Sequence, residues 1–164
     1  FLKEYLEYSK DDKIKKLQRI NLLETINKVV KASKLRNRKI NIKCSRSLYL
    51  TTDKNSLYRI IFNLFENASR YGTQIEINAK KEMKKIKINI SDNGPGIEDQ
   101  FRRKIFKPFF KIDHSRNINQ GGSGLGLSIS KELGRKISAT IRLEKSNKLK
   151  GSSFSIILPQ RKVT

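Results

Sequence analysis

Residues 53–71, DKNSLYRIIFNLFENASRY, predict a long amphipathic helix that must pack against the rest of the fold. Asp53 is a favourable N-cap residue, because its carboxylate can accept a hydrogen bond from a backbone N–H of the first turn. Apolar side chains recur at the three- and four-residue spacing that places them on one face of a helix. This stripe consists of Leu57, Ile60, Ile61, Leu64, Phe65 and Ala68. It indicates a helix that covers a sheet.

Three polar residues flank that stripe. Asn63, Asn67 and Arg70 lie at i, i+4 and i+7, so at about 100° per residue they share an arc of roughly 60°. Asn is a mediocre helix former, and two of them in register at mid-helix indicate a function. An amide oxygen suits a hard divalent cation that phosphates already neutralise, and Arg70 can reach a phosphate. A polar flank that faces water is the alternative for this pattern taken alone.

A second motif, residues 92–96, DNGPG, follows an alternating apolar stretch that ends at Ile90. At the end of a strand, Asp92 can accept a hydrogen bond from a ligand. Gly94 and Gly96 let the backbone come close to that ligand. An ordinary Asp-Asn-Gly-Pro turn is the alternative.

A third motif, residues 121–127, GGSGLGL, runs directly into a predicted helix. Backbone N–H groups at a helix N-terminus, at the positive end of its dipole, can bind a phosphate. The motif lacks the Gly-Lys-Ser/Thr ending of a P-loop, and no strand leads directly into it as in a dinucleotide-binding fold. A flexible linker is the alternative, although linkers do not usually carry leucines such as Leu125 and Leu127 between glycines.

The order of the remaining elements predicts an α+β fold. Asn21 suits the N-cap of a first helix, since Glu24 follows three residues later. Further elements are expected as strands at 40–44 and 48–50, the helix of 53–71, strands at 74–79 and 86–90, a short helix at 98–105, an irregular stretch at 107–122, a helix from 124 to 136, and strands at 139–144 and 153–158. This order fits a two-layer α/β sandwich, in which one mixed sheet is covered on one face by three helices.

The first residues have a different character. Phe1–Ser9 has near-helical spacing and a polar run follows it. We therefore expect residues 1–14 to be a helix end and linker, and residues 15–164 to be one domain of ordinary size. Because the chain begins with Phe instead of Met, we expect a fragment of a longer protein. The single Cys44 excludes an internal disulfide and fits a reducing compartment.

The composition is strongly basic: 37 Lys and Arg against 15 Asp and Glu give a net charge of +22 on 164 residues. Such a charge suggests nucleic acid as a partner. The cations are scattered through every segment, however, and no aromatic residues interleave them in a stacking pattern. The chain is also rich in Ile and Asn, and AT-rich coding sequences produce a high content of Lys together with these two residues. We therefore expect non-specific polyanion binding at low salt and no specific nucleic-acid partner.

Taken together, the three motifs resemble those of the catalytic, ATP-binding domain of sensor histidine kinases, over about residues 15–159. That domain belongs to the superfamily shared with gyrase, Hsp90 and MutL, and the resemblance implies its Bergerat ATP-binding fold. The four boxes of the family are matched, in the order N, G1, F and G2, as follows: 63–68 (NLFENA), 92–96 (DNGPG), 106–110 (FKPFF) and 122–127 (GSGLGL). Residues 68–72 and 110–116 resemble osmosensor-type membrane kinases in particular.

The resemblance implies a role for each polar residue of the motifs. Asn67 would hold Mg²⁺ against the triphosphate of ATP, and Asn63 would lie beside the phosphates as a catalytic residue. Arg70 would contact a phosphate. Tyr71 would lie against the adenine, and Asp92 would accept a hydrogen bond from the adenine amino group.

The resemblance also implies how the loops take part. Gly94 and Gly96 would make room for the base. The remaining expected nucleotide contacts are Ile97, Gly122, Ser123, Gly124, Leu125, Gly126 and Leu127. Lys107–Gly121 would be a mobile lid over ATP, from which Lys111 or Arg116 would reach the γ-phosphate as further catalytic residues. Positioning and charge neutralisation do most of the work in phosphoryl transfer.

One position sorts the reaction within the superfamily. Hydrolysing members carry a Glu one helical turn before the Mg²⁺-binding Asn, where it activates water; this chain has Asn63 there. The resemblance therefore implies a protein histidine kinase and not an ATPase. Kinases of the family phosphorylate a His on a preceding helical hairpin, whereas the only His here, His114, falls within the expected lid. We expect His114 to be a loop residue and the acceptor to lie outside this chain.

The implied cofactors are ATP and Mg²⁺. The implied partners are the kinase's own His-containing dimerisation domain and a response regulator, in an intact protein that is a homodimer. The domain would lie on the cytoplasmic side of the inner membrane of a bacterium. Two alternatives stay open: an anti-sigma-factor-type Ser kinase of the same superfamily, against which the F box and the long lid argue, and a basic nucleic-acid-binding module.

Overall fold

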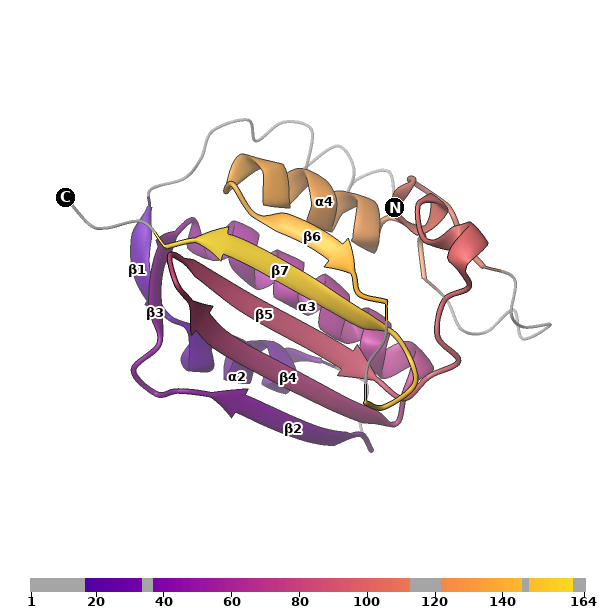
Figure 1. The fold of residues 1–164 in the computed structure, drawn as a ribbon, viewed down its shortest axis with the longest axis horizontal. Helices are drawn as coiled ribbons and strands as arrows, with labels where there is room; N and C mark the ends of the chain where they lie inside the picture. Colours follow the sequence, from indigo (N-terminus) through magenta and orange to yellow (C-terminus); the bar gives the residue numbers. More distant parts are fainter. Residues whose placement is uncertain (1–16, 34–36, 113–121, 146–147, 161–164) are drawn as a thin grey trace.

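A computed structural model describes residues 17–33, 37–112, 122–145 and 148–160. Its main sheet has five strands in the order β2-β4-β5-β7-β6 (Figure 1). The strand bounds are Lys39–Cys44 (β2), Gln74–Glu82 (β4), Lys85–Asp92 (β5), Thr140–Leu143 (β6) and Ser153–Pro159 (β7). β2 runs parallel to β4 and the other pairs are antiparallel, so the sheet is mixed as predicted.

Three α-helices cover one face of this sheet, which confirms the predicted two-layer α+β sandwich (Figure 1). They are α2 (Leu22–Ala32), α3 (Lys54–Tyr71) and α4 (Gly126–Lys136). The two expected N-caps form: the Asn21 side chain accepts from Glu24 N at 3.1 Å, and Asp53 Oδ1 accepts from Ser56 N at 2.7 Å. Capping of this kind fixes where each helix begins.

The core lies between the two layers. The apolar stripe of α3 is buried, with Leu57, Ile60, Ile61 and Leu64 fully inaccessible. It packs on the alternate sheet residues that face the helices, which are Ile75, Ile77, Ala79, Ile86, Ile88, Ile90, Phe154, Ile156 and Leu158. Each large side chain buried in this way stabilises the fold by about 1.5–3 kcal/mol. This packing fixes α3, and with it the polar flank beside the stripe.

The fold differs from the prediction in two places. β1 (Gln18–Asn21) was not predicted; it pairs antiparallel with β3 (Tyr49–Thr52) in a separate two-stranded sheet, so the expectation of a single sheet was incomplete. The short helix expected at 98–105 is instead two 3₁₀ turns, η1 (Asp99–Phe101) and η2 (Lys104–Phe106). The turns close through three-residue hydrogen bonds, Phe101 N to Glu98 O and Lys107 N to Lys104 O, both at 2.9 Å. The expected helix end and linker at residues 1–14 lie outside the described residues.

Candidate functional site

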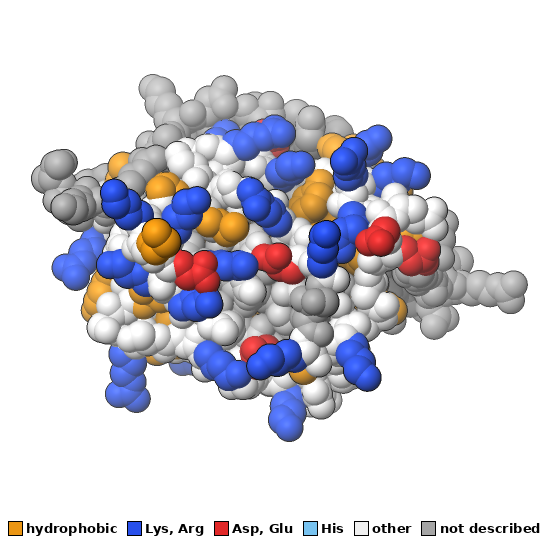
Figure 2. All heavy atoms as spheres, viewed as in Figure 1, with side chains coloured by type: hydrophobic (Ala, Val, Ile, Leu, Met, Phe, Trp, Pro, Cys, Tyr) orange, Lys and Arg blue, Asp and Glu red, His pale blue; other side chains and the backbone are white. Residues whose placement is uncertain are grey.

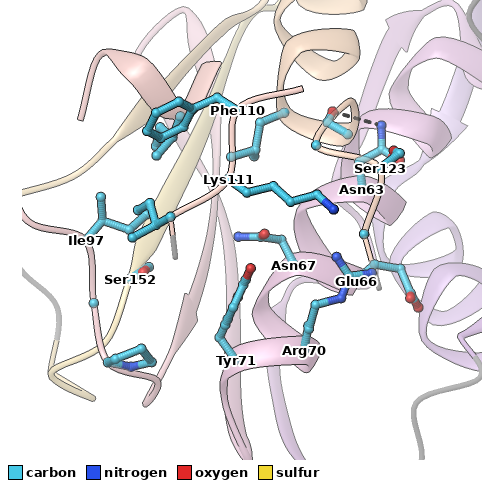
Figure 3. Close-up of a pocket in the computed structure, with 18 of the residues that line it drawn as sticks. Asn63, Glu66, Asn67, Arg70, Tyr71, Ile97, Phe110, Lys111, Ser123 and Ser152 are labelled. Atoms are coloured by element: carbon cyan, nitrogen blue, oxygen red, sulfur yellow. Dashed lines mark hydrogen bonds between the residues drawn. The ribbon is translucent and has the colours of Figure 1, made fainter. Parts of the chain in front are cut away.

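A cavity of about 280 Å³ opens where α3, the loop after β5, η2 and the loop before α4 meet (Figure 3). The three sequence motifs converge on it although they are far apart in the chain. Of the predicted site residues, the following line it: Asn63, Asn67, Arg70, Tyr71, Gly96, Ile97, Lys111, Gly122, Ser123, Gly124, Gly126 and Leu127. The structure therefore brings most of the predicted site together in one place.

The polar flank of α3 forms one wall of this cavity. Asn67 and Tyr71 point into it, and the long side chain of Lys111 extends across it from the opposite wall (Figure 3). Asn63 has a further role, since its amide nitrogen donates to Gly126 O at 3.2 Å and to Ser130 Oγ at 3.3 Å. Asn63 therefore joins α3 to the first turn of α4.

The N-terminus of α4 forms the second wall. Within the described residues no side chain caps the first turn of this helix, and just ahead of it Ser123 Oγ accepts from Leu125 N at 3.3 Å. The loop ahead of it contributes Gly122, Ser123 and Gly124 to the lining. An uncapped helix N-terminus that borders a cavity is a favourable place for an anionic group such as a phosphate.

The F box holds that loop in place. Phe109 N donates to Gly124 O at 2.9 Å, and a Cβ on Gly124 would lie 2.8 Å from the carbonyl carbon of Phe109. Gly124 also has a φ of +71°, which favours glycine. Phe110 lines the cavity, and its ring lies 6.0 Å from that of Phe101. Residues 106–110 thus support the glycine loop from outside.

Asp92 lies beneath the cavity, 1% exposed, and is not among its lining residues. Its Oδ1 accepts from Gly94 N at 2.8 Å and from Ser152 N at 3.2 Å. Burial raises the pKa of the Asp92 carboxyl above its ordinary value, and the two backbone hydrogen bonds oppose this by stabilising the charged form. The carboxylate is therefore held rigidly, with its orientation set by the backbone.

The sequence reasoning missed the segment that holds Asp92 from the other side. Ser152 lines the cavity, and a Cβ on Gly151 would lie 2.3 Å from Asp92 O and 2.5 Å from Gly94 N. Only glycine permits so close an approach between the start of β7 and the end of β5. The available signal was a glycine directly before the last predicted strand. Phe62, Glu66, Pro95, Ile105, Phe110 and Ile112 also line the cavity and were not predicted as site residues.

Opposite charges are unevenly distributed around the cavity. Arg70 and Lys111 are its cationic lining residues, and Glu66 is the single carboxylate among the described ones. Glu66 Oε1 accepts a 2.5 Å hydrogen bond from Ser33 Oγ at the end of α2, so this carboxylate is engaged by the neighbouring helix. The remaining positive charge suits a polyanionic ligand.

Several predicted site residues do not line the cavity. The Leu125 side chain is 1% exposed and belongs to the core, so only its backbone is placed to take part in the predicted nucleotide contact. Gly94 lies beneath the cavity with Asp92; a Cβ there would be 2.8 Å from Asp92 Oδ1. Arg116 and His114 lie outside the described residues, as does the expected lid beyond Ile112.

The wider surface was predicted to be basic. Among residues 17–33, 37–112, 122–145 and 148–160, no group of three or more His, Cys, Asp or Glu is arranged to hold a metal ion. Lys and Arg are spread across the open face of the sheet, with a few Asp and Glu between them (Figure 2). None of the described helices is both long enough and apolar enough to span a membrane.

Comparison with known proteins agrees with this geometry. The model of the histidine kinase-, DNA gyrase B- and HSP90-like ATPase family matches residues 52–162. Hybrid signal transduction histidine kinase F of Dictyostelium discoideum is 38% identical over 116 residues, which are 66% of this chain and 10% of that protein. Swarming motility regulation sensor protein RssA of Serratia marcescens is 34% identical over 120 residues, 71% of this chain and 25% of that protein. The chain thus spans a quarter or less of the length of these two curated relatives.

A solved structure gives the same picture. The catalytic domain of histidine kinase ThkA superposes with a TM-score of 0.74 at 25% identity, covering 89% of this chain and 97% of that one. The matched family model includes α3, the DNGPG loop and the glycine loop, which are the elements that build the cavity. The chain therefore belongs to the family of histidine kinase-, DNA gyrase B- and HSP90-like ATPases.

Proposed function

We propose that this chain is the ATP-binding catalytic domain of a two-component sensor histidine kinase, and that it transfers the γ-phosphate of ATP to a His on a separate helical domain. The observation that carries the proposal is the convergence of Asn67, Arg70 and Lys111 with the uncapped N-terminus of α4 around one cavity. This set combines an amide oxygen, two cations and free N–H groups. It is the chemistry that a triphosphate with a divalent cation requires.

In this proposal each wall of the cavity has its own task. Tyr71 and Ile97 flank the base, and the buried Asp92 below them selects adenine by accepting from its amino group. Arg70 and Lys111 neutralise phosphate charge, while residues 122–127 bind phosphate through backbone N–H groups. Asn67 holds Mg²⁺ through its amide oxygen. Mg²⁺ supplies neutralisation of the charge that develops on the transferred group.

Asn63 favours transfer over hydrolysis. Its side chain is an amide, which cannot take a proton from water usefully near neutral pH. Its nitrogen is also engaged with Gly126 O and Ser130 Oγ. Glu66, the carboxylate that lines the cavity, is hydrogen-bonded to Ser33 at the edge of α2. Among the described residues Glu66 is the only carboxylate that lines the cavity, and it precedes Asn67 by one position, not by the helical turn at which hydrolysing members carry their Glu.

The proposal extends to the intact protein. We propose that it is a homodimer with its own His-containing helical domain, that a response regulator receives the phosphate, and that the catalytic domain lies on the cytoplasmic side of a bacterial inner membrane. The names of the relatives, a hybrid signal transduction histidine kinase and a sensor protein, support this class of protein.

The test is a transfer assay with γ-labelled ATP. Three reactions with ATP and Mg²⁺ are compared: this chain alone, the His-bearing helical domain of the same protein alone, and the two together. We expect acid-labile label on the helical domain only when both are present, and little phosphate release from this chain alone. Acid-stable label, typical of phosphoserine, would indicate a Ser kinase, and steady phosphate release would indicate a hydrolysing relative.

A further inference from the structure

A second cavity, of about 800 Å³, lies against η1, η2, α4 and the edge strand β6. η2 separates it from the candidate nucleotide site: Ile105 lines the first cavity, whereas Lys104 and Phe106 line the second. We call this second cavity the β6 groove. Apart from Phe106 of the F box, its lining residues belong to none of the motifs that the proposed function uses.

The β6 groove is strongly cationic above an apolar floor. Its cations are Arg102, Arg103, Lys104, Lys131 and Arg142, and among the described residues the exposed Asp99 is the one carboxylate that lines it. Phe106, Ile141 and Leu143 form the floor. The Lys131 ammonium lies 5.0 Å from the centre of the Phe106 ring, so it stands at the boundary between the floor and the cationic rim.

The groove also exposes a strand edge. β6 is the last strand of the five-stranded sheet, and no other described strand pairs with its outer side. Glu144 N donates to Ser153 O at 2.8 Å, so in the antiparallel pair the residues at alternate positions, Ile141 and Leu143, direct their backbone groups away from β7. Arg102 Nη2 donates to Leu143 O at 2.6 Å from that outer side, which agrees with this register.

We propose that the β6 groove binds an extended acidic segment of a partner protein, which pairs with β6 as an added strand. Backbone pairing with the N–H and C=O of Ile141 and with the N–H of Leu143 would give affinity, as in other cases of strand addition, while Leu143 O keeps its hydrogen bond from Arg102. Successive side chains of the segment would point alternately to the two faces of the sheet. Acidic side chains on one face would meet Arg142, and those on the other would meet Lys131.

Charge and chemistry favour this occupant over two others. A second copy of this chain paired edge to edge would bring its own Arg142 and neighbouring cations against the same groove, and like charges opposite one another are destabilising. Nucleic acid would satisfy the cations but would leave the peptide groups of Ile141 unpaired and the apolar floor uncovered. An acidic polypeptide satisfies the cations, the strand edge and the floor together.

The test uses the whole chain and a fluorescent peptide of about six residues, Glu-Glu-Val-Val-Glu-Glu, which matches the length of an ordinary strand and places Glu on both of its faces. The groove variant carries R103E, K131E and R142E. The matched control carries K28E, K31E and K54E, which make the same change in net charge on exposed positions of α2 and α3. Binding of ATP by both variants checks that the fold is intact.

We expect the groove variant to bind the peptide at least about tenfold more weakly than the control variant, since three favourable ion pairs become repulsive. A peptide with the same sequence but N-methylated at alternate residues should also bind at least about tenfold more weakly, because it cannot donate to the strand edge. Equal losses in the two variants would overturn the groove as the site. Undiminished binding of the N-methylated peptide, or displacement of the peptide by single-stranded DNA at equal charge and equal concentration, would overturn strand pairing in favour of polyanion binding.

Discussion

Replacing Gly151 by Ala tests whether the start of β7 holds the Asp92 carboxylate in place. The added Cβ would lie 2.3 Å from Asp92 O, 2.5 Å from Asp92 Oδ1 and 2.5 Å from Gly94 N. Ordinary van der Waals contact begins at 3.4 Å, so the two strand ends would have to separate by about an ångström. Two of these atoms belong to the backbone, and the third, Asp92 Oδ1, is held by hydrogen bonds from Gly94 N and Ser152 N.

The cost follows from what this separation breaks. Asp92 N donates to Ser152 O at 2.9 Å, and Ser152 N donates to Asp92 Oδ1 at 3.2 Å. A neutral hydrogen bond contributes about 0.5–1.5 kcal/mol, and one to a charged group about 1.5–3 kcal/mol. Losing both, or retaining them at the expense of backbone strain, should lower the free energy of unfolding by about 2–4 kcal/mol. We also expect ATP affinity to fall, because Asp92 would lose its orientation.

The assay is urea unfolding followed by far-ultraviolet circular dichroism, since the chain has no Trp to report by fluorescence. With a slope of about 1–3 kcal/mol per molar urea, the midpoint should fall by at least about 0.7 M. Gly126→Ala is the matched control: its Cβ would come no closer than 3.8 Å to any neighbour. It should be neutral, or stabilising by up to about 1 kcal/mol from helix propensity. Unfolding of Gly151→Ala within about 0.5 kcal/mol of the original chain would refute the reasoning.

Three further predictions concern the walls of the cavity. Asn67→Ala should weaken ATP binding about tenfold or more in Mg²⁺ and much less in EDTA, by calorimetric titration; equal weakening in both would exclude the metal role. Asp92→Asn should lose most ATP affinity, because an amide donor replaces one oxygen, while the other oxygen can keep its backbone hydrogen bonds. The pKa of Asp92 is raised in the folded state, so the unfolding free energy of the original chain should fall as pH rises from the ordinary Asp pKa through this higher value. Asp92→Asn should lack that fall. Identical pH profiles of the two proteins would contradict the direction of the pKa shift. Asn63→Asp should lower the unfolding free energy by about 1–3 kcal/mol, because an acceptor would face the Gly126 carbonyl. Ser130→Ala removes two neutral hydrogen bonds but brings no two acceptors together, so it should cost less; the reverse order in urea unfolding would contradict this.

Local signals made most of the fold predictable. The N-caps at Asn21 and Asp53 and the apolar stripe of α3 can each be recognised within one short stretch of sequence. Helices α2 and α3 begin where these signals place them. β1 carries no such signal. Its four residues become a strand because Ile20 lies opposite Leu50 in a pairing with β3, and such a partner cannot be read from a short segment.

The candidate site likewise has residues that the sequence could predict and residues that it could not. Asn67, Arg70 and the glycine loop could be predicted, because each belongs to a motif of adjacent residues and the cavity brings the motifs together. Gly151 and Ser152 could not, since their importance arises from contact with Asp92, 60 positions from Ser152 in the sequence. Leu125 shows what a motif of adjacent residues does not indicate. It lies within the glycine motif, and its side chain packs in the core.

Asn63 links the chemistry of the site to its construction. Where the hydrolysing relatives need a carboxylate to activate water, this chain has an amide whose nitrogen donates to Gly126 O and Ser130 Oγ. A carboxylate there would lose both donations and would set an acceptor against the Gly126 carbonyl. In the proposed function the Asn therefore leaves this position without a general base, and the same side chain fixes the first turn of α4 against α3. A domain meant to hold ATP until an acceptor arrives needs both properties, because an immobile phosphate site without a base keeps the γ-phosphate from water.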